Sequence, residues 1–136
     1  MRKCYGEQLM APTSIKSVIV TGASRGIGRA VAKRLARDGF AVVVNDAGNP
    51  TKTDEVVAEI KAASVEAIAV QADVANGADV EHLFKQTMDT FCSIDVVVNC
   101  AGIMLLSLIA GRDLELFDNM IATNLHGIFV VLGQAS

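Results

Sequence analysis

The fold is decided by one stretch near the N-terminus, which reads Val18-Ile19-Val20-Thr21-Gly22-Ala23-Ser24-Arg25-Gly26-Ile27-Gly28-Arg29-Ala30-Val31. A short β-branched apolar run ends at Thr21, and a helical pattern begins near Gly26. A strand, a glycine-rich turn and a helix start in this order predict a cradle for a phosphate group. The free N–H groups of the first helical turn and the positive end of the helix dipole would face the anion.

Three glycines in this stretch follow the spacing Gly-x-x-x-Gly-x-Gly. Gly22 permits a tight turn without a Cβ clash. Gly26 lets a pyrophosphate approach the backbone, and Gly28 lets the helix pack close to the strand. Because glycines occur in many ordinary turns, the rest of the chain has to decide between a phosphate cradle and a plain loop.

Length and composition restrict the class of protein. The 136 residues suffice for one domain, and 51% hydrophobic with 20% charged residues is ordinary for a globular chain. The net charge of -3 gives no reason to expect a nucleic-acid partner. Uninterrupted apolar runs such as residues 96–98 are too short to span a membrane, and no apolar core follows the basic N-terminal residues. We therefore expect a cytoplasmic protein without a membrane segment, and the three cysteines form no metal-binding pattern.

Strands and helices alternate along the chain. The patterns predict strands at residues 17–21, 41–45, 67–70 and 94–98, and helices at residues 26–38, 51–63, 79–91 and 113–136. Residues 1–16 show no periodicity and are interpreted as a loose leader, and residues 17–136 as one dinucleotide-binding domain. This alternation predicts an α/β fold with a parallel sheet and helices on both faces. Right-handed crossovers favour the strand order 3-2-1-4.

A ligand site is expected where this strand order reverses. The first and fourth strands flank that point, so a ligand should lie over their carboxyl ends. The glycine turn and the segment from Asn99 to Gly102 both fall there. Asn99 could tie neighbouring backbone together through its amide, and Ala101 and Gly102 are small enough to let a cofactor pass.

Two residues near the glycine turn bear on the choice of cofactor. Asp46 lies 18 positions after Gly28, where a carboxylate can bind the ribose hydroxyls of NAD and repel the 2′-phosphate of NADP. Arg25 could pair with that phosphate instead. Asp46 carries more weight, because close like-charge repulsion excludes a ligand more firmly than one exposed arginine attracts it. NAD is slightly favoured, and an ordinary turn aspartate is the alternative.

Asp73 follows the third strand and precedes Val74. A carboxylate at this place could accept a hydrogen bond from an adenine amino group. A turn or helix-capping aspartate explains the spacing equally well.

Four motifs in this order resemble the short-chain dehydrogenase/reductase family, most closely its 3-oxoacyl-(acyl carrier protein) reductase type. Residues 21–28 resemble its Thr-Gly-x-x-x-Gly-x-Gly motif, Asp73-Val74 its adenine-contacting pair, and residues 99–102 its Asn-Asn-Ala-Gly motif, with Cys100 in place of the second Asn. Asn124 matches the helix asparagine of the family's catalytic tetrad. The resemblance implies a Rossmann-type fold, NAD or NADP as cofactor, and hydride transfer to or from a carbonyl or secondary alcohol.

The cofactor-binding residues expected from motif and spacing together are Gly22, Ser24, Arg25, Gly26, Ile27, Gly28, Asp46, Asp73, Val74, Asn99, Ala101 and Gly102. Asn124 is the catalytic residue that the resemblance implies, and no metal ligand is expected.

The family's catalytic Ser and its Tyr-x-x-x-Lys pair lie beyond the Asn helix, whereas this sequence ends at Ser136. Its one tyrosine is Tyr5, with no lysine four residues later. Losing a positioned proton donor typically costs about a hundredfold to ten-thousandfold in rate. We therefore expect a domain that is incomplete at its C-terminal end and not a working dehydrogenase by itself. The alternatives are a non-catalytic nucleotide-binding module that pairs with a longer relative, and a functionless product of a damaged reading frame.

Further expectations follow from the same comparison with the family. Ser64 and Cys92 stand where relatives usually have glycine, which commonly serves a positive φ angle. Without a fifth strand, the fourth strand becomes an edge that favours association. The last helix is apolar on several sides, so we expect a homo-oligomer formed through it.

Overall fold

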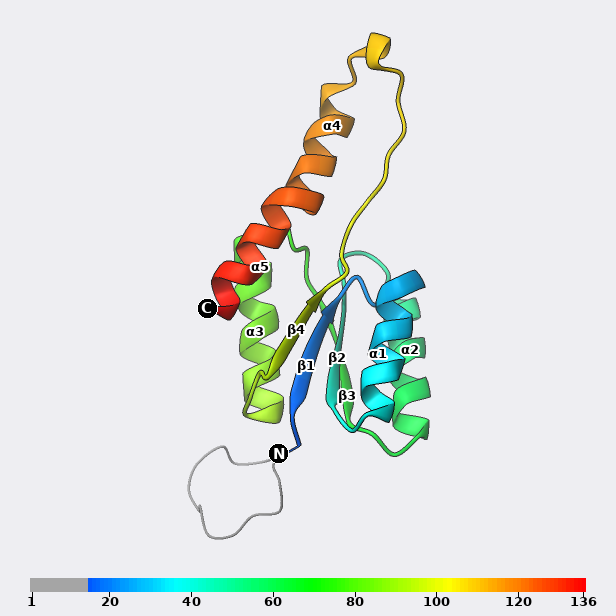
Figure 1. Cartoon of the computed structure of the whole chain (residues 1–136), viewed down its shortest axis with the longest axis vertical. Coiled ribbons are helices and arrows are strands. Elements are labelled where there is room, and N and C mark those ends of the chain that lie inside the picture. Colours follow the sequence, from blue (N-terminus) through cyan, green and yellow to red (C-terminus); the bar gives the residue numbers. More distant parts are fainter. Residues whose placement is uncertain (1–14) are drawn as a thin grey trace.

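Four parallel strands form one sheet in the order β3-β2-β1-β4, as predicted (Figure 1). The computed structural model describes residues 15–136. The strands are β1 (Ser17–Thr21), β2 (Ala41–Asp46), β3 (Ala67–Gln71) and β4 (Val96–Asn99). The helices are α1 (Gly26–Arg37), α2 (Pro50–Ala62), α3 (Gly77–Phe91), α4 (Leu114–Ile121) and α5 (Gly127–Ala135). Of the predicted leader, only Ile15 and Lys16 fall within the described residues, where they are exposed and irregular.

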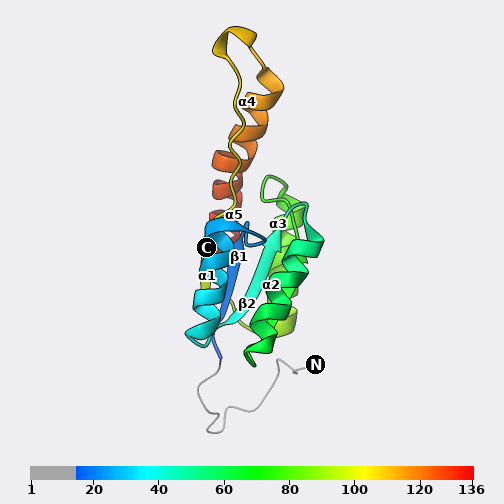
Figure 2. The same ribbon diagram turned by 90° about the vertical axis from the view of Figure 1, so that its right-hand side faces the viewer.

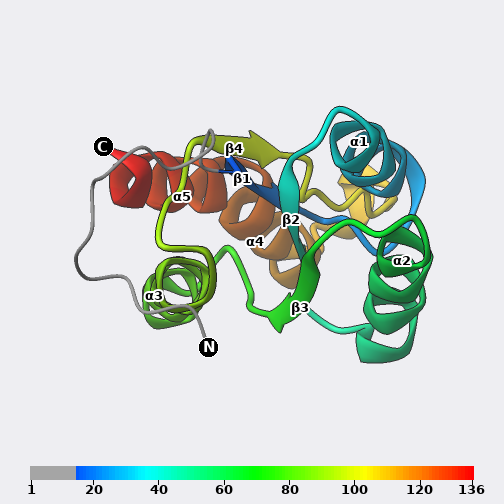
Figure 3. The ribbon, with the colours of Figure 1, turned by 90° about the horizontal axis from the view of Figure 1, so that it is seen from below.

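The helices cover both faces of the sheet, with α1 and α2 on one side and α3 and α5 on the other (Figure 3). Alternate residues of β1 and β2 divide between two apolar clusters. Val18 and Val42 pack toward α1 and α2, whereas Ile19 and Val43 pack toward α3 and α5. Every residue of β1 is buried, because this strand has a neighbour on each side and helices on each face. The glycine turn therefore starts from the most enclosed strand of the sheet.

The predicted boundaries agree with the structure to within two residues. The main difference is β4, which begins at Val96 and not at Ile94. Ser93 and Asp95 instead anchor the turn before β4 on the start of β1. The Ser17 backbone N–H donates to Asp95 Oδ2 over 2.8 Å, and the Ser17 hydroxyl donates to the Ser93 carbonyl. These bonds hold residues 93–95 beside β1, where the sequence had predicted the first residues of a longer strand.

The predicted last helix is interrupted. Between α4 and α5 lies a π-helical turn, η2 (Ala122–His126), which holds Asn124. Before α4, residues 100–113 run without regular structure except for the 3₁₀ turn η1 (Ile109–Gly111). This loop and α4 extend away from the sheet as an arm, defined here as residues 103–121 (Figures 1 and 2). Six of its large apolar side chains are well exposed: Met104, Leu106, Leu108, Ile109, Leu114 and Phe117.

The helical segment Leu114–Ala135 is long and apolar enough to cross a membrane by length and composition. The sequence analysis considered only uninterrupted apolar runs and did not identify this segment, because Asn119, Thr123 and Asn124 interrupt its apolar residues. Core helices of soluble proteins meet the same criterion, so this finding does not by itself place the chain in a membrane.

Ser64 and Cys92 have φ angles of 61° and 63°. This is the left-handed backbone conformation that the sequence analysis expected where glycine is usual. Each lies directly beyond the end of a helix, the usual place for glycine in this conformation. A side chain with a Cβ atom costs roughly 1–2 kcal/mol there. Each of these two positions therefore holds a side chain in a backbone conformation that glycine adopts without this cost.

We expect Ser64→Gly to raise the free energy of unfolding by about 1 kcal/mol, because it removes the left-handed penalty at an exposed site. Urea-induced unfolding followed by circular dichroism measures the change. Ser64→Ala is the control: it keeps a Cβ atom and should leave the stability within about 0.5 kcal/mol of the starting protein. Equal stabilisation by both substitutions would refute strain as the cause.

Candidate cofactor-binding site

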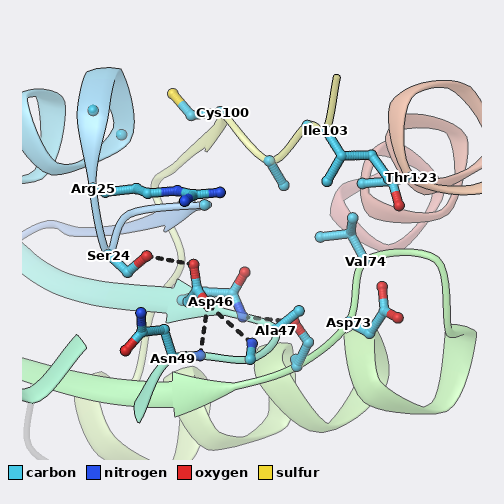
Figure 4. A pocket seen from close by; sticks show the side chains of 18 of the residues that line it. Ser24, Arg25, Asp46, Ala47, Asn49, Asp73, Val74, Cys100, Ile103 and Thr123 are labelled. Atoms are coloured by element: carbon cyan, nitrogen blue, oxygen red, sulfur yellow. Dashed lines mark hydrogen bonds between the residues drawn. The ribbon is translucent and has the colours of Figure 1, made fainter. Parts of the chain in front are cut away.

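A cleft of about 570 Å³ opens at the carboxyl ends of the strands (Figure 4). The loops after β1, β2, β3 and β4 form it, together with Thr123 from η2. Every predicted site residue lines this cleft except Asn99 and Asn124. The structure thus brings together residues that lie up to 80 positions apart in the chain, at the reversal of the strand order.

The glycine turn is built by close backbone approach. A Cβ atom on Gly28 would lie 2.3 Å from the Gly22 carbonyl oxygen, so only glycine lets α1 pack so near to the end of β1. Gly26 has a φ angle of +55° and open space around its Cα atom. The turn therefore has the form predicted for a backbone that a ligand approaches closely.

The N-terminus of α1 faces the same cleft. Its cap residue, Arg25, makes no side-chain hydrogen bond to the helix, and the first intrahelical bond runs from the Arg29 N–H to the Arg25 carbonyl. Gly26, Ile27 and Gly28, which precede that bond, all line the cleft. Their N–H groups and the helix dipole can bind an anion there.

Thr21 joins β1 to the segment after β4. Its buried hydroxyl accepts hydrogen bonds from the N–H groups of Cys100 and Ala101, each over 3.1 Å, and donates to Asn99 Oδ1 over 2.6 Å. The Asn99 side chain thus points to Thr21 and not into the cleft. The sequence predicted that the Asn99 amide ties neighbouring backbone together. In the structure the Thr21 hydroxyl binds the backbone instead, and Asn99 Oδ1 accepts a hydrogen bond from that hydroxyl.

Asp46 is both a turn residue and part of the cleft wall. Its Oδ1 accepts the N–H groups of Gly48 and Asn49 over 2.9 and 3.0 Å. Its Oδ2 accepts the hydroxyl of buried Ser24 over 2.6 Å (Figure 4). The two readings of this residue, turn aspartate and ribose ligand, are therefore compatible. The bond from Ser24 fixes the orientation of the carboxylate beside the glycine turn.

Asp73 also takes part in a turn. Its Oδ1 accepts the Ala75 N–H over 2.9 Å, and its own N–H donates to Asp79 Oδ2 over 2.9 Å. Since Asp73 and Val74 also line the cleft, the turn role of Asp73 and a place in the cleft wall are compatible.

Asn45 forms part of the cleft floor between β2 and β3. Its Nδ2 donates to the carbonyls of Val70 and Ala72, each over 3.0 Å, although the side chain is almost completely buried. Its Oδ1 has no hydrogen-bond partner among residues 15–136. A buried polar oxygen without a partner is costly, which makes the floor of this cleft one of the few unsatisfied places in the described fold.

The Asn124 side chain makes two hydrogen bonds to the backbone of Ile103, the first residue of the arm. The Ile103 N–H donates to Asn124 Oδ1 over 2.8 Å, and Asn124 Nδ2 donates to the Ile103 carbonyl over 2.7 Å. The π-helical turn places this amide opposite the backbone that leaves β4. Within the described residues Asn124 is therefore a positioning residue, and its neighbour Thr123 is the one that lines the cleft.

Cys100 carries a free thiol at the rim of the cleft. Partial burial raises the pKa of this thiol above its usual value, so the sulfur is protonated at neutral pH. A protonated, half-buried thiol packs as a small apolar group.

Several lining residues escaped the sequence analysis as site residues: Asn45, Ala47, Gly48, Asn49, Ala72, Cys100, Ile103 and Thr123. Asn45 was counted only as part of a strand and Ile103 only as part of a loop. Their part in the cleft depends on how four loops converge, which spacing along the chain does not reveal. Cys100 differs from the other residues in this list, because it lies within the motif at residues 99–102 that the sequence analysis had identified.

The fold and the cleft together define a dinucleotide-binding α/β protein of Rossmann type. The glycine cradle, the open helix N-terminus and the carboxylate after β2 fit an adenine dinucleotide. A family model for short chain dehydrogenases matches residues 16–136. The chain belongs to the short-chain dehydrogenase family.

Curated relatives of similar sequence are 3-oxoacyl-(acyl-carrier-protein) reductases. The protein from Staphylococcus epidermidis is 48% identical over 114 residues, which make up 84% of this chain and 47% of that protein. The protein from Synechocystis sp. is 50% identical over 121 residues, or 89% of this chain and 49% of that protein. The chain thus spans about half the length of the curated relatives that it matches.

Solved structures confirm the fold. A short chain dehydrogenase from Mycobacterium avium has a TM-score of 0.83 at 40% identity, covering 88% of this chain and 44% of that chain. A short chain dehydrogenase from Burkholderia cenocepacia, solved in complex with NADP, also has a TM-score of 0.83, at 36% identity, covering 87% of this chain and 48% of that chain.

We expect Gly26→Ala to lower the affinity for NADH or NADPH at least about tenfold, because its methyl group would stand where a phosphate approaches the backbone. Fluorescence titration of the reduced nucleotide measures this change. Gly39→Ala is the matched control, since Gly39 also has a positive φ angle and open surroundings but lies outside the cleft. Both variants should lose roughly 1–2 kcal/mol of stability, and equal losses of affinity would contradict the cradle.

Proposed function

We propose that this chain is the NAD(P)-binding part of a short-chain oxidoreductase of the 3-oxoacyl reductase type. When bound, the nicotinamide cofactor supplies or accepts the hydride, and the substrate is a carbonyl compound or a secondary alcohol. The observation that carries the proposal is the cleft in which the open N-terminus of α1, Gly26 and Asp46 meet. The names of the curated relatives support the substrate class.

Each part of the cofactor has a proposed contact. The pyrophosphate lies on the N–H groups at the start of α1, where Gly26 leaves room for it. The adenosine ribose binds Asp46, and the adenine amino group binds Asp73 with the backbone of Val74 beside it. Ala101 and Gly102 line the path toward the nicotinamide.

NAD is proposed as the preferred cofactor. Asp46 Oδ1 already accepts two N–H groups, and Oδ2 accepts one hydroxyl, so Oδ2 retains capacity for a ribose hydroxyl. The 2′-phosphate of NADP would meet the same carboxylate and be repelled. Arg25 lines the cleft as well and is the residue that offers NADP a compensating contact.

We expect Asp46→Asn to raise the affinity for NADPH about tenfold relative to NADH, because it removes the charge but keeps a side chain of the same shape (about 1.4 kcal/mol). Equilibrium titrations with each nucleotide give the ratio. Arg25→Gln is the companion variant and should weaken NADPH more than NADH. A ratio that Asp46→Asn leaves unchanged would remove Asp46 from the choice of cofactor.

The chain alone is proposed to be inactive as a reductase. The cleft holds a protonated thiol at Cys100, but thiols protonated at neutral pH are poor partners for the proton transfer that carbonyl reduction needs. No tyrosine lies among residues 15–136. Asn124 remains a proposed member of the catalytic machinery, acting through its hold on Ile103.

We expect the purified chain to bind reduced nucleotide but to show no oxidation of NADH or NADPH above a no-protein blank with a 3-oxoacyl thioester. Absorbance at the reduced nicotinamide band follows the reaction, and a complete relative from the same family serves as the positive control. Turnover well above the blank would overturn the proposed inactivity while leaving the cofactor site intact.

A second candidate function is a non-catalytic nucleotide-binding module that joins other subunits through its last helix. The exposed apolar face of η2 and α5 favours it, since Phe129 is 76% and Leu125 64% exposed. We propose that this face pairs with a second copy, in the cytoplasm, without nucleic acid or membrane as partner.

A further inference from the structure

Gly127, the first residue of α5, lies buried against the turn that follows β3. A Cβ atom at this position would stand 2.8 Å from Val74 Cγ2 and 3.3 Å from the Val74 carbonyl carbon. Carbon atoms in contact without a bond prefer separations of about 3.5–4.0 Å. Any side chain at residue 127 would therefore overlap Val74.

The backbone conformation does not require glycine at this position. Gly127 has φ and ψ angles of -59° and -39°, which are ordinary values for a right-handed helix. In such a conformation alanine favours the helix more than glycine does. What glycine provides here is therefore the space beside Val74 and not backbone freedom.

The Val74 side chain has no room to turn away from residue 127. It is 3% exposed and belongs to the apolar cluster that also contains Val131 of α5. β-branched side chains have restricted χ1 angles, and a closely packed interior offers no second position for their methyl groups. A methyl group on residue 127 would therefore displace backbone.

The helix is held on both sides of Gly127. Three residues before it, the Asn124 side chain makes its two hydrogen bonds to the Ile103 backbone. Four residues after it, Val131 is completely buried in the apolar cluster. The helix therefore presents a fixed surface to the turn after β3.

The turn after β3 is held by bonds among its own residues and the start of α3. Asp73 Oδ1 accepts the Ala75 N–H, and the Asp73 carbonyl accepts the Asn76 N–H, each over 2.9 Å. The Asp73 N–H donates to Asp79 Oδ2 over 2.9 Å. Because these bonds are local, the turn can shift as a unit, and a shift of Val74 would carry the Asp73 carboxylate with it.

The contact between Gly127 and Val74 adjoins the cleft. Asp73, Val74 and Thr123 all line the cleft, and Thr123 lies about one helical turn before Gly127. Figure 4 shows these three lining side chains along the same side of the cleft. The distance between the last helix and the turn after β3 therefore sets the position of this wall.

We propose that Gly127 is a positioning residue for the adenine side of the cleft. Because it leaves room for Val74, the last helix holds the turn after β3 where the Asp73 carboxylate reaches the adenine amino group. This inference rests on the adenine contact of the proposed function, and it adds to that contact a residue that does not itself line the cleft.

A double-mutant cycle measured without nucleotide tests the contact. We expect Gly127→Ala to lower the midpoint urea concentration of unfolding, although alanine is the better helix former. In a Val74→Ala background, which lacks the overlapping γ-methyl group, the same substitution should lower the midpoint much less or raise it. Equal effects of Gly127→Ala in the two backgrounds would overturn the proposal.

Gly133→Ala is the matched control for this cycle. Gly133 lies in the same helix, is exposed, and has nothing within 4 Å of the place where a Cβ atom would stand. The substitution should not lower the midpoint, because it adds helix propensity without an overlap. A loss equal to that of Gly127→Ala would show that the Val74 contact is not the cause.

Two reduced nucleotides test the positioning role. The probes are NADH and its hypoxanthine analogue, in which a carbonyl oxygen replaces the adenine amino group. A carboxylate accepts a hydrogen bond from the amino group but not from the oxygen, so the starting chain should bind NADH more tightly. We expect Gly127→Ala to weaken NADH at least about tenfold and the analogue less than about threefold. Gly133→Ala should change neither affinity.

The outcomes separate this inference from the proposed function. A starting chain that binds the two nucleotides equally, or binds neither, would refute the proposed adenine contact and with it the positioning role. If the starting chain prefers NADH but Gly127→Ala weakens both nucleotides equally, or weakens neither, only the positioning role is refuted. If Gly127→Ala does not fold, folding of the double variant with Val74→Ala supports the contact. Failure of that double variant, when Val74→Ala alone folds, would overturn it.

Discussion

The hydroxyl of Thr21 is the contact on which the cleft depends. It lies at the end of the most enclosed strand and holds the backbone of Cys100 and Ala101 by two accepted hydrogen bonds while donating one to Asn99. These bonds link the end of β1 to the backbone that follows β4. Because of them, the glycine turn and the segment after β4 lie side by side, and both line the cleft.

A second set of contacts fixes the remaining walls. Ser24 holds Asp46 against the glycine turn, and Asn124 holds Ile103 at the base of the arm. Each of the three ties joins segments that lie far apart in the sequence. The cleft is therefore positioned by short side chains with few rotatable bonds, which lose little entropy when ordered.

The strand order and most cleft residues could be predicted from the sequence, because both rest on local signals. Thr21 to Gly28 carries a strand end, a turn and a helix start in eight residues, and β-branched runs mark the buried strands. Asn99 shows where this reasoning ends. Its position at the end of β4 was predicted correctly, but the direction of its side chain depends on Thr21, 78 residues earlier. The π-helical turn around Asn124 was missed likewise, because η2 has an ordinary helical sequence and its irregularity appears only in three dimensions.

The burial of the strands falls from the middle of the sheet toward β4, and this asymmetry has a physical consequence. β3 is also an edge strand, yet α2 and α3 flank it, and its exposed residues include the polar Gln71. β4 is apolar along three of its four residues and has α5 on one side only, with a groove between them. The two edges of the sheet therefore differ in their cover: α2 and α3 pack on β3, whereas the apolar residues of β4 stay partly exposed.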